Sequence, residues 1–436
     1  MDATSPAVSS ADALRLPYRL DPAGGCPHAE LARLRELGDV VDVELPGGVP
    51  GVAVVGHDAL RELLAHPDVA KAPEHFAALR SGQVPEGWPL LAFIATPGLL
   101  TADGADHRRL RTLVNRAFTP RRAEGLRPRI VELTARLLDR VAADAADATA
   151  AADGTAAEET AVVDLRGVFA EPLPMAVICE LLGVDEEYWD EAHALSNRVI
   201  STDSTPAEAI AANQSMFQLM TTVVERRTAE PGGDLTSALI GARAEDGDRL
   251  STEELVGTLM TLTVAGNETI THLITNAVRA LSAHPDELAR VRSGSVGWAD
   301  VVEETLRWDG PVGFFPFRFP TRDLELGGAL IPAGTAVLAG YTAAGRDTAG
   351  LGPGAGEFHP AGTSAGHLSF GHGVHFCLGA PLARLEGAIA LEQLYTRFPD
   401  LAVAVPDDEV PRFGSFVNNG VRSLPVRLGR DAFAEA

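Results

Sequence analysis

The residues with the clearest chemical potential lie in one loop, Phe370–Gly379, which holds a cysteine among glycines and histidines. A helical pattern begins directly after it at Ala380, and the N–H groups and dipole of a helix N-terminus lower the pKa of a nearby thiol. A thiolate at Cys377, in an apolar loop, is suited to bind the iron of a haem. Three glycines of the loop permit positive φ angles and close contact with a flat ligand: Gly371, Gly373 and Gly379.

Two other interpretations of this loop stay open. Many cysteines outside disulfides are buried thiols that only pack in a core. A zinc site is the second alternative, although the spacing matches no common structural zinc motif and no second cysteine is near. The candidate zinc ligands are His367, His372, His375 and Cys377. A zinc hydrolase that uses His372, His375 and Cys377 is therefore an alternative function.

A second candidate site lies in the middle of a long helix predicted over residues 251–283. No residue from 255 to 267 is charged, so this part of the helix is expected to be buried. Glu268 and Thr269 come next and could pass on protons, while Gly266 would let a flat group approach the backbone. The alternative is a core helix with a packing glycine and a glutamate that points to water.

The elements around these motifs are predicted mostly as helices. Ser251 and Glu254 form a capping box that starts the long helix, and helical patterns dominate from residue 58 to 283. Strands are predicted at Val40–Leu45 and Gly51–Val55, around a Pro46-Gly47-Gly48 turn, within Leu324–Leu338, and at Pro425–Leu428. We therefore expect one mainly α domain with small β-sheets (α+β) over residues 1–436, with residues 1–20 poorly ordered and residues 142–161 as a surface insertion.

Charge and cysteine content exclude several classes of protein. Lys and Arg number 36 against 60 Asp and Glu, a net charge of −24, which disfavours binding to nucleic acid. The three cysteines, Cys26, Cys179 and Cys377, are odd in number and far apart, which favours a reducing cytoplasm. No stretch has the length and apolarity of a membrane span, so we expect a soluble protein. We also expect it to be cytoplasmic and a monomer. Lys71 is the only lysine, which we attribute to codon usage.

Four motifs together resemble the cytochrome P-450 monooxygenases. Residues 370–386 match the family's haem-binding pattern Phe-Gly-x-Gly-x-His-x-Cys-x-Gly followed by Ala-Arg-x-Glu. Residues 265–269 resemble its oxygen-activating motif, and Glu304-Thr305-Leu306-Arg307 resembles its Glu-x-x-Arg motif. His107 and Arg111 resemble its pair of haem-propionate ligands. The motifs occur in family order over roughly residues 30 to 430, and the whole is most similar to actinobacterial members.

The resemblance implies a cytochrome P-450 fold, with heme b between the long central helix and the helix after the cysteine loop. It implies that Cys377 is the proximal thiolate ligand and that Glu268 and Thr269 deliver protons during oxygen activation. Glu304 and Arg307 would have a structural role. The implied cofactor-binding residues are His107, Arg111, Ala265, Gly266, Arg318, Phe370, Gly371, His375, Cys377 and Gly379. The implied reaction consumes O2 and takes electrons from a ferredoxin and its reductase; a haem-binding sensor without turnover is the alternative.

One position departs from the family pattern. Glu357 stands where relatives have an arginine that completes a network with the Glu-x-x-Arg pair. The reversed charge would be destabilising near Glu304 unless the side chain of Glu357 turns outward. Gly345 also replaces a more usual asparagine, and Arg346 is the candidate to take over the missing pairing.

The resemblance also places a substrate pocket and a docking surface. An apolar, aromatic lining suits an apolar small molecule, although we expect about half of these side chains to be ordinary core residues. The candidate lining residues are Phe93, Ile94, Val264, Phe314, Phe315 and Phe416. The stretch 315–318 is similar to a branch that oxidises polyketides, steroids and flat aromatics. Eight arginines but one acid, Glu124, lie between His107 and Arg129, which favours docking of an acidic ferredoxin or, alternatively, a solvated helix face.

Overall fold

The computed structural model describes residues 17–21, 27–95, 98–151, 162–200, 206–242, 247–362, 366–415 and 417–429. Cys26, Phe416 and residues 1–16 lie outside these ranges. The predicted insertion at 142–161 is only partly described, because helix α7, Arg127–Ala151, continues through its first half and residues 152–161 lie outside. No helix among the described residues is long and apolar enough to cross a membrane.

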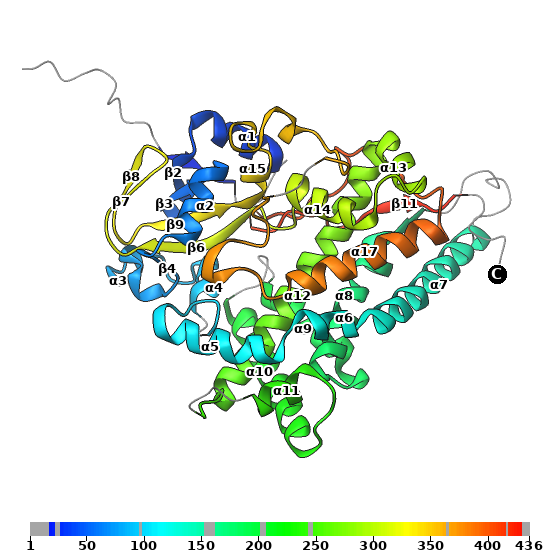
Figure 1. The fold of residues 1–436 in the computed structure, drawn as a ribbon, viewed down its shortest axis with the longest axis horizontal. Helices are drawn as coiled ribbons and strands as arrows, with labels where there is room; N and C mark the ends of the chain where they lie inside the picture. Colours follow the sequence, from blue (N-terminus) through cyan, green and yellow to red (C-terminus); the bar gives the residue numbers. More distant parts are fainter. Residues whose placement is uncertain are drawn as a thin grey trace, which may run out of the picture.

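A six-stranded sheet lies at one side of the molecule (Figure 1). Its order is β1 (Tyr18–Arg19), β2 (Val40–Leu45), β3 (Val49–Val54), β9 (Ala336–Gly340), β6 (Phe314–Pro320) and β4 (Val69–Ala70). The predicted hairpin is confirmed: β2 pairs with β3 from Val40↔Val54 to Leu45↔Val49. Its turn uses two glycines at positive φ, 78° and 74°, as tight turns require.

Strand β6 is absent from the predicted strands because it contains Pro316, which cannot donate a ladder hydrogen bond. The structure accommodates the proline at an irregularity, where the register between β6 and β9 shifts between Phe315 and Arg318. This strand matters for the site because Arg318 projects from it.

Two small sheets complete the β structure. The predicted region 324–338 contains the hairpin of β7 (Leu324–Leu326) and β8 (Ala329–Ile331) before β9 begins. The predicted last strand is β11, Pro425–Arg427, which lies between β10 (Ala402–Val403) and β5 (Val162–Asp164).

Helices form the larger part of the molecule (Figure 1). The predicted central helix is α12, Thr252–Ala283, and both hydrogen bonds of its capping box, between Ser251 and Glu254, are present at 2.8 and 3.1 Å. The other helices are α1 (Pro27–Leu37), α2 (His57–Ala65), α3 (Ala77–Arg80), α4 (Ala92–Ala95), α5 (Gly104–Ala117), α6 (Pro120–Gly125), α8 (Pro172–Leu182), α9 (Trp189–Ile200), α10 (Pro206–Ala229), α11 (Leu235–Gly241), α13 (Pro285–Arg292), α14 (Trp298–Asp309), α15 (Tyr341–Gly345), α16 (Thr348–Leu351) and α17 (Ala380–Arg397).

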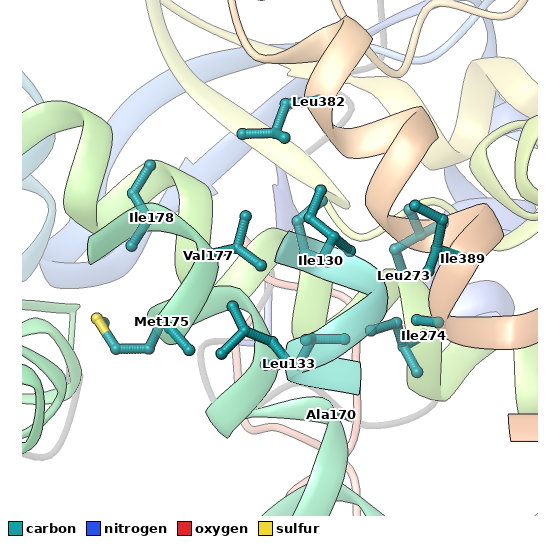
Figure 2. Close-up of a cluster of buried hydrophobic side chains, with 14 of the residues drawn as sticks. Ile130, Leu133, Ala170, Met175, Val177, Ile178, Leu273, Ile274, Leu382 and Ile389 are labelled. Carbon is teal, nitrogen blue, oxygen red and sulfur yellow. The ribbon is translucent and has the colours of Figure 1, made fainter. Parts of the chain in front are cut away.

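The main core holds α12 against its neighbours. Figure 2 shows Leu273 and Ile274 of α12 among Leu133 of α7, Val177 of α8 and Ile389 of α17. Burial of such side chains contributes roughly 1.5–3 kcal/mol each. This packing fixes the central helix and the helix after the cysteine loop relative to each other, which is what a site between them needs.

Candidate functional site

The cysteine loop is held in shape by its own backbone. The N–H of Cys377 donates to the carbonyl of Phe370 at 2.8 Å, and that of Gly371 donates to Leu368 at 2.7 Å. Gly371 and Gly373 both have a φ of 76°, which side chains other than glycine rarely adopt. A Cβ at Gly373 would also lie 2.8 Å from the carbonyl oxygen of Leu64, so the loop is fitted closely to α2.

The thiol of Cys377 lies three residues before the start of α17. Cys377 is an exposed residue. Protein atoms packed around its sulfur nevertheless desolvate the thiol and raise its pKa. The N–H groups of Gly379 and Ala380 and the charges of Arg111 and Arg384 act in the opposite direction. The predicted effect of the helix N-terminus is confirmed, because its N–H groups lower the pKa, although desolvation is larger and raises it.

Basic groups converge on the cysteine loop from two other elements. The rings of His107, on α5, and His375 lie with centroids 4.1 Å apart, and both His107 and Arg318 of β6 are buried. Within the described residues, Nε2 of His107 and Nε of Arg318 have no hydrogen-bond partner. Buried donors of this kind normally have an acceptor. Two carboxylates, as a haem carries, fit this set of donors, and the predicted residues His107, Arg318 and His375 are brought together.

The charge state of His107 follows from its surroundings. Burial, with the charges of His375 and Arg111, lowers the pKa of His107 to about 4. It is therefore a neutral imidazole at neutral pH and can donate one hydrogen bond. Arg111, one turn further along α5, faces the sulfur: burial lowers its pKa, and the charge of Cys377 acts against that effect.

The acid and the alcohol of α12 do not form a pair. The Thr269 hydroxyl donates to the carbonyl of Ala265 at 2.7 Å, so its oxygen keeps lone pairs that can accept a proton donor. Glu268 is buried and contacts Arg166 at 2.9 Å and His272 at 3.2 Å. Adjacent helical residues point in different directions, which sequence proximity hides.

Glu268 is held as a carboxylate. Burial by itself would raise its pKa, yet the hydrogen bonds and charges of His272 and Arg166 outweigh burial and lower the pKa to about 2. Arg166 also forms an ion pair with Glu171, which accepts hydrogen bonds from His193 at 2.9 Å and Asn197 at 2.7 Å. The sequence gives no signal for this network, because Arg166 and Glu268 are 102 positions apart.

Gly266 has a packing role. A Cβ at this position would lie 3.1 Å from Cδ1 of Ile178, so the missing side chain makes room for α8. The packing alternative therefore describes the space next to Gly266, and the approach of a flat group to its backbone stays a prediction. Ala265 next to it is exposed and lies on a different side of the helix.

The two side chains of the Glu-x-x-Arg motif join a buried network with nearby backbone carbonyls. Arg307 donates to both carboxylate oxygens of Glu304, at 2.6 and 2.7 Å. Its remaining donors go to the carbonyls of Gly345, Ala355 and Glu357, at 2.6–2.7 Å. A Cβ at Gly345 would collide with the carbonyl oxygen of Arg307, which explains why glycine stands there.

The departure at Glu357 is thereby resolved. Its backbone carbonyl serves the network, while the residue is exposed and carries its charge outward. Arg346, the candidate to take over the missing pairing, contacts Trp308. Its guanidinium stacks 3.8 Å from the ring of Trp308 and donates to the carbonyl of that residue.

The zinc alternative finds no support. No group of three or more His, Cys, Asp or Glu side chains is arranged to hold a metal ion in the described part of the chain. His367 instead contacts Glu303 at 3.2 Å, and Glu303 also binds Arg384.

The candidate substrate residues divide into two sets. Ile94 and Phe314 are fully buried members of a hydrophobic core, so they do not remain candidates for the pocket lining. Phe93 and Val264 are half-buried and remain candidates. The ring of Phe315 lies beneath the ammonium group of Lys71, and Phe416 lies outside the described residues.

Glu386, from the Ala-Arg-x-Glu end of the motif, is buried in α17 without a charged partner. Its exposed fraction is 2%, and Oε1 has no hydrogen-bond partner among the described residues. Burial raises the pKa of Glu386 to about 8. The carboxyl group is therefore largely protonated at neutral pH.

Replacing Glu386 by glutamine is expected to flatten the pH dependence of stability. The unfolded chain loses this proton above the ordinary value of 4.5, whereas the folded protein keeps it up to about 8. The free energy of unfolding of the wild type therefore falls as pH rises through this window, by up to about 1.4 kcal/mol per pH unit, and levels off above it. Urea unfolding at several pH values between 5 and 9 measures this. The matched control is Glu392→Gln, at an exposed position of α17, which should parallel the wild type. Parallel curves for wild type and Glu386→Gln would contradict the assignment.

Known proteins are similar to this chain in sequence and fold. The cytochrome P450 family profile matches residues 35–294 and 299–416. The chain is 42% identical over 419 residues to the 2-hydroxy-5-methyl-1-naphthoate 7-hydroxylase of Streptomyces carzinostaticus, covering 95% of this chain and 98% of that protein. It is 38% identical to the 6-deoxyerythronolide B hydroxylase of Saccharopolyspora erythraea, covering 91% and 95%. A solved structure described as "Testerone bound CYP154C4" from Streptomyces sp. ATCC 11861 is 42% identical, with a TM-score of 0.87 and coverage of 95% and 99%.

The fold and the cysteine site thus define a haem-thiolate protein. The chain belongs to the cytochrome P450 family, and the predicted fold is confirmed. Heme b is the cofactor of this family. Its relatives are hydroxylases, and the protein is accordingly a P450 monooxygenase. This outcome favours the enzyme over the sensor that the sequence left open.

Proposed function

We propose that the protein hydroxylates or epoxidises an apolar natural product of secondary metabolism, with electrons from a ferredoxin and its reductase. The observation that carries the proposal is the convergence of buried donors, His107 and Arg318, on the loop that presents Cys377. When bound, the haem supplies the activation of O2. The free thiols of Cys179 and Cys377 support a cytoplasmic enzyme, and we propose that it works as a monomer.

The chain's own residues would have separate tasks. Cys377 would hold the iron through its thiolate, while His107, Arg111, Arg318 and His375 would bind the propionates as donors. Phe370 would be fixed beside the cofactor, since the guanidinium of Arg384 stacks 4.6 Å from its ring. Each of these groups binds or orients the cofactor and leaves proton handling to α12.

Proton handling would depend on Thr269. Its hydroxyl is fixed by Ala265 and keeps an acceptor oxygen toward the side of α12 on which Ala265 is exposed. The carboxylate of Glu268 forms an ion pair with Arg166, so Glu268 would act as an acid only after that ion pair breaks. In this proposal the hydroxyl of Thr269 would contact the reacting group, and the carboxyl group of Glu268, on another side of α12, would supply its protons.

The substrate class is supported by the relatives. Their names or descriptions give a naphthoate, an erythronolide and "testerone" as ligands or substrates. We propose a ring system of this size and apolarity, a polyketide, steroid or flat aromatic, bound near Phe93 and Val264. A spectral titration of the haem-loaded protein with compounds of these three classes tests this. Turnover of the best binder under ¹⁸O2 with ferredoxin and reductase should add one labelled oxygen; product without label would contradict the proposal.

The electron donor is proposed to dock where basic side chains are exposed. Several arginines of the basic stretch are already used inside the chain: Arg109 pairs with Asp248 and Glu254, and Arg127 pairs with Glu124. Arg108 and Arg121 are exposed and remain for an acidic partner. Such steering weakens with salt, so the rate of reduction by a ferredoxin should fall as ionic strength rises.

Replacing Thr269 by valine is expected to uncouple electron transfer from product formation. Valine keeps the shape of threonine and removes the only polar group that the side chain offers. We expect the fraction of electrons recovered in product to fall by at least about tenfold, since a positioned proton-transfer group typically contributes about 10²–10⁴-fold to a rate. The measurement is product formed per NAD(P)H consumed. Thr269→Ser, which retains the hydroxyl, should recover most of the coupling; unchanged coupling in Thr269→Val would overturn the role.

A further inference from the structure

Lys71, the only lysine of the chain, lies in the group of basic residues around His107 and Arg318. We propose that Lys71 is a further cofactor-binding residue, whose ammonium group forms an ion pair with a haem propionate. This inference rests on the proposed function, because it needs a haem in the site. It adds a cation that none of the four motifs contains.

The backbone fixes where Lys71 lies. It follows β4, whose residues Val69 and Ala70 pair with Pro320 and Phe319 of β6. The N–H groups of Lys71 and Ala72 both donate to the carboxylate of Asp103, at 2.7–3.0 Å. Asp103 precedes α5, one turn before His107. The segment is therefore attached both to the strand that carries Arg318 and to the helix that carries His107.

The side chain is buried with little to neutralise it. Lys71 is 3% exposed, and its ammonium nitrogen lies 4.7 Å from the centre of the Phe315 ring, on the same strand as Arg318. Within the described residues, its ammonium group has no hydrogen bond and no ion pair. A buried lysine is uncommon without a partner, and one face of an aromatic ring replaces only part of its hydration.

The charges around Lys71 are unbalanced. Burial, together with the charge of Arg318, lowers the pKa of Lys71 well below its usual range. Among the described residues, Asp103 is the anion that acts against this effect. Its oxygens already accept the two N–H groups, and Oδ1 lies 3.9 Å from Nε2 of His375. Lys71 and Arg318 thus lie near one carboxylate, that of Asp103, which already accepts hydrogen bonds from two backbone N–H groups. An additional carboxylate, as a propionate provides, would favour the charged form of Lys71.

A lysine kept only for packing would behave differently. Its amine would titrate alike with and without haem. A cofactor-binding lysine gains a carboxylate partner when haem binds. Because this negative charge stabilises the ammonium form, the pKa of the lysine must rise. The codon-usage explanation for the single lysine accounts for the absence of others but not for the burial of this one.

The single lysine makes the test unusually direct. Reductive methylation with ¹³C-formaldehyde labels only Lys71 and the N-terminal amine, so one lysine signal can be followed by NMR. The haem-loaded protein is measured as its diamagnetic ferrous–CO form and compared with the haem-stripped protein. We expect the titration midpoint of Lys71 to be higher with haem by at least one pH unit. Equal midpoints in the two forms would overturn the proposal.

Variants give the second readout, the rate at which haem transfers to excess apomyoglobin. Lys71→Met should lose haem about tenfold faster, the lower range for a lost charge-assisted hydrogen bond, and Lys71→Arg should stay within about threefold of the wild type. The matched control is Arg322→Met, an exposed cation after β6 that pairs with Asp68. Wild-type rates in Lys71→Met would also overturn the proposal.

Failure of this inference and failure of the proposed function are distinguishable. If the wild type carried no thiolate-ligated haem, the proposed function itself would fall. If the wild type carried such a haem, and Arg318→Met lost it quickly while Lys71→Met did not, only the role of Lys71 would be refuted.

Discussion

Replacing Cys377 by alanine is expected to abolish the thiolate signature of the haem, which is the strongly red-shifted Soret band of the reduced protein with CO. Alanine cannot ligate iron, so the thiolate that the red-shifted band reports is removed. The buried donors around His107 and Arg318 would remain, so some haem should still bind without the thiolate. The expected result is a protein with weakly bound haem, no red-shifted band and no turnover.

The chain offers a matched control for this variant. Cys179 is a free, buried thiol of α8 whose pKa burial raises to about 12, so it stays protonated. Cys179→Ala should keep the red-shifted band and the activity. A Cys377→Ala protein that retained the band would show that another group is the ligand.

Replacing Arg307 by leucine is expected to give the largest loss of stability. It would leave the buried carboxylate of Glu304 without its guanidinium partner, and the carbonyls of Gly345, Ala355 and Glu357 would lose their donor. Both side chains are nearly inaccessible, with exposed fractions of 7% and 3%, so water screens the pair little. Breaking one partner of a buried ion pair costs about 3–5 kcal/mol. Urea unfolding of the haem-loaded protein measures the loss, and poor haem incorporation should accompany it.

Two control variants distinguish the effect of this buried network from the effect of removing any positive charge. Arg290 forms the same i,i+3 type of pair with Glu287 on α13 but is 45% exposed, so Arg290→Leu should change the free energy of unfolding by less than about 1 kcal/mol. Arg307→Lys should still be strongly destabilised, because one ammonium group cannot replace a planar fork that bonds five oxygens. A loss below about 1 kcal/mol in Arg307→Leu would contradict the structural role.

The features that could be predicted from sequence are those set by neighbours along the chain. The capping box of α12, the β2–β3 turn and the start of α17 depend on residues within a few positions, and all three occur where predicted. The resemblance adds the cysteine loop and the Glu-x-x-Arg motif because their spacing is also local.

The features that could not be predicted depend on contacts distant in sequence. Glu268 and Thr269 are neighbours in sequence, yet Arg166 draws the carboxylate to another side of the helix. The reversed charge at Glu357 is harmless because only its backbone enters the network, which a side-chain pattern cannot show. Lys71 joins the site because Asp103, 32 positions away, holds its backbone.

The central claim is that the Cys377 loop binds heme b through a thiolate, beneath the exposed side of α12. The most direct measurement is the absorption spectrum of the purified wild-type protein from haem-replete cells, reduced and then exposed to CO. The account predicts a coloured protein whose Soret band moves strongly to the red on addition of CO. A folded but colourless protein that takes up no added hemin, or a coloured one whose CO band stays at the position typical of a histidine ligand, would contradict it.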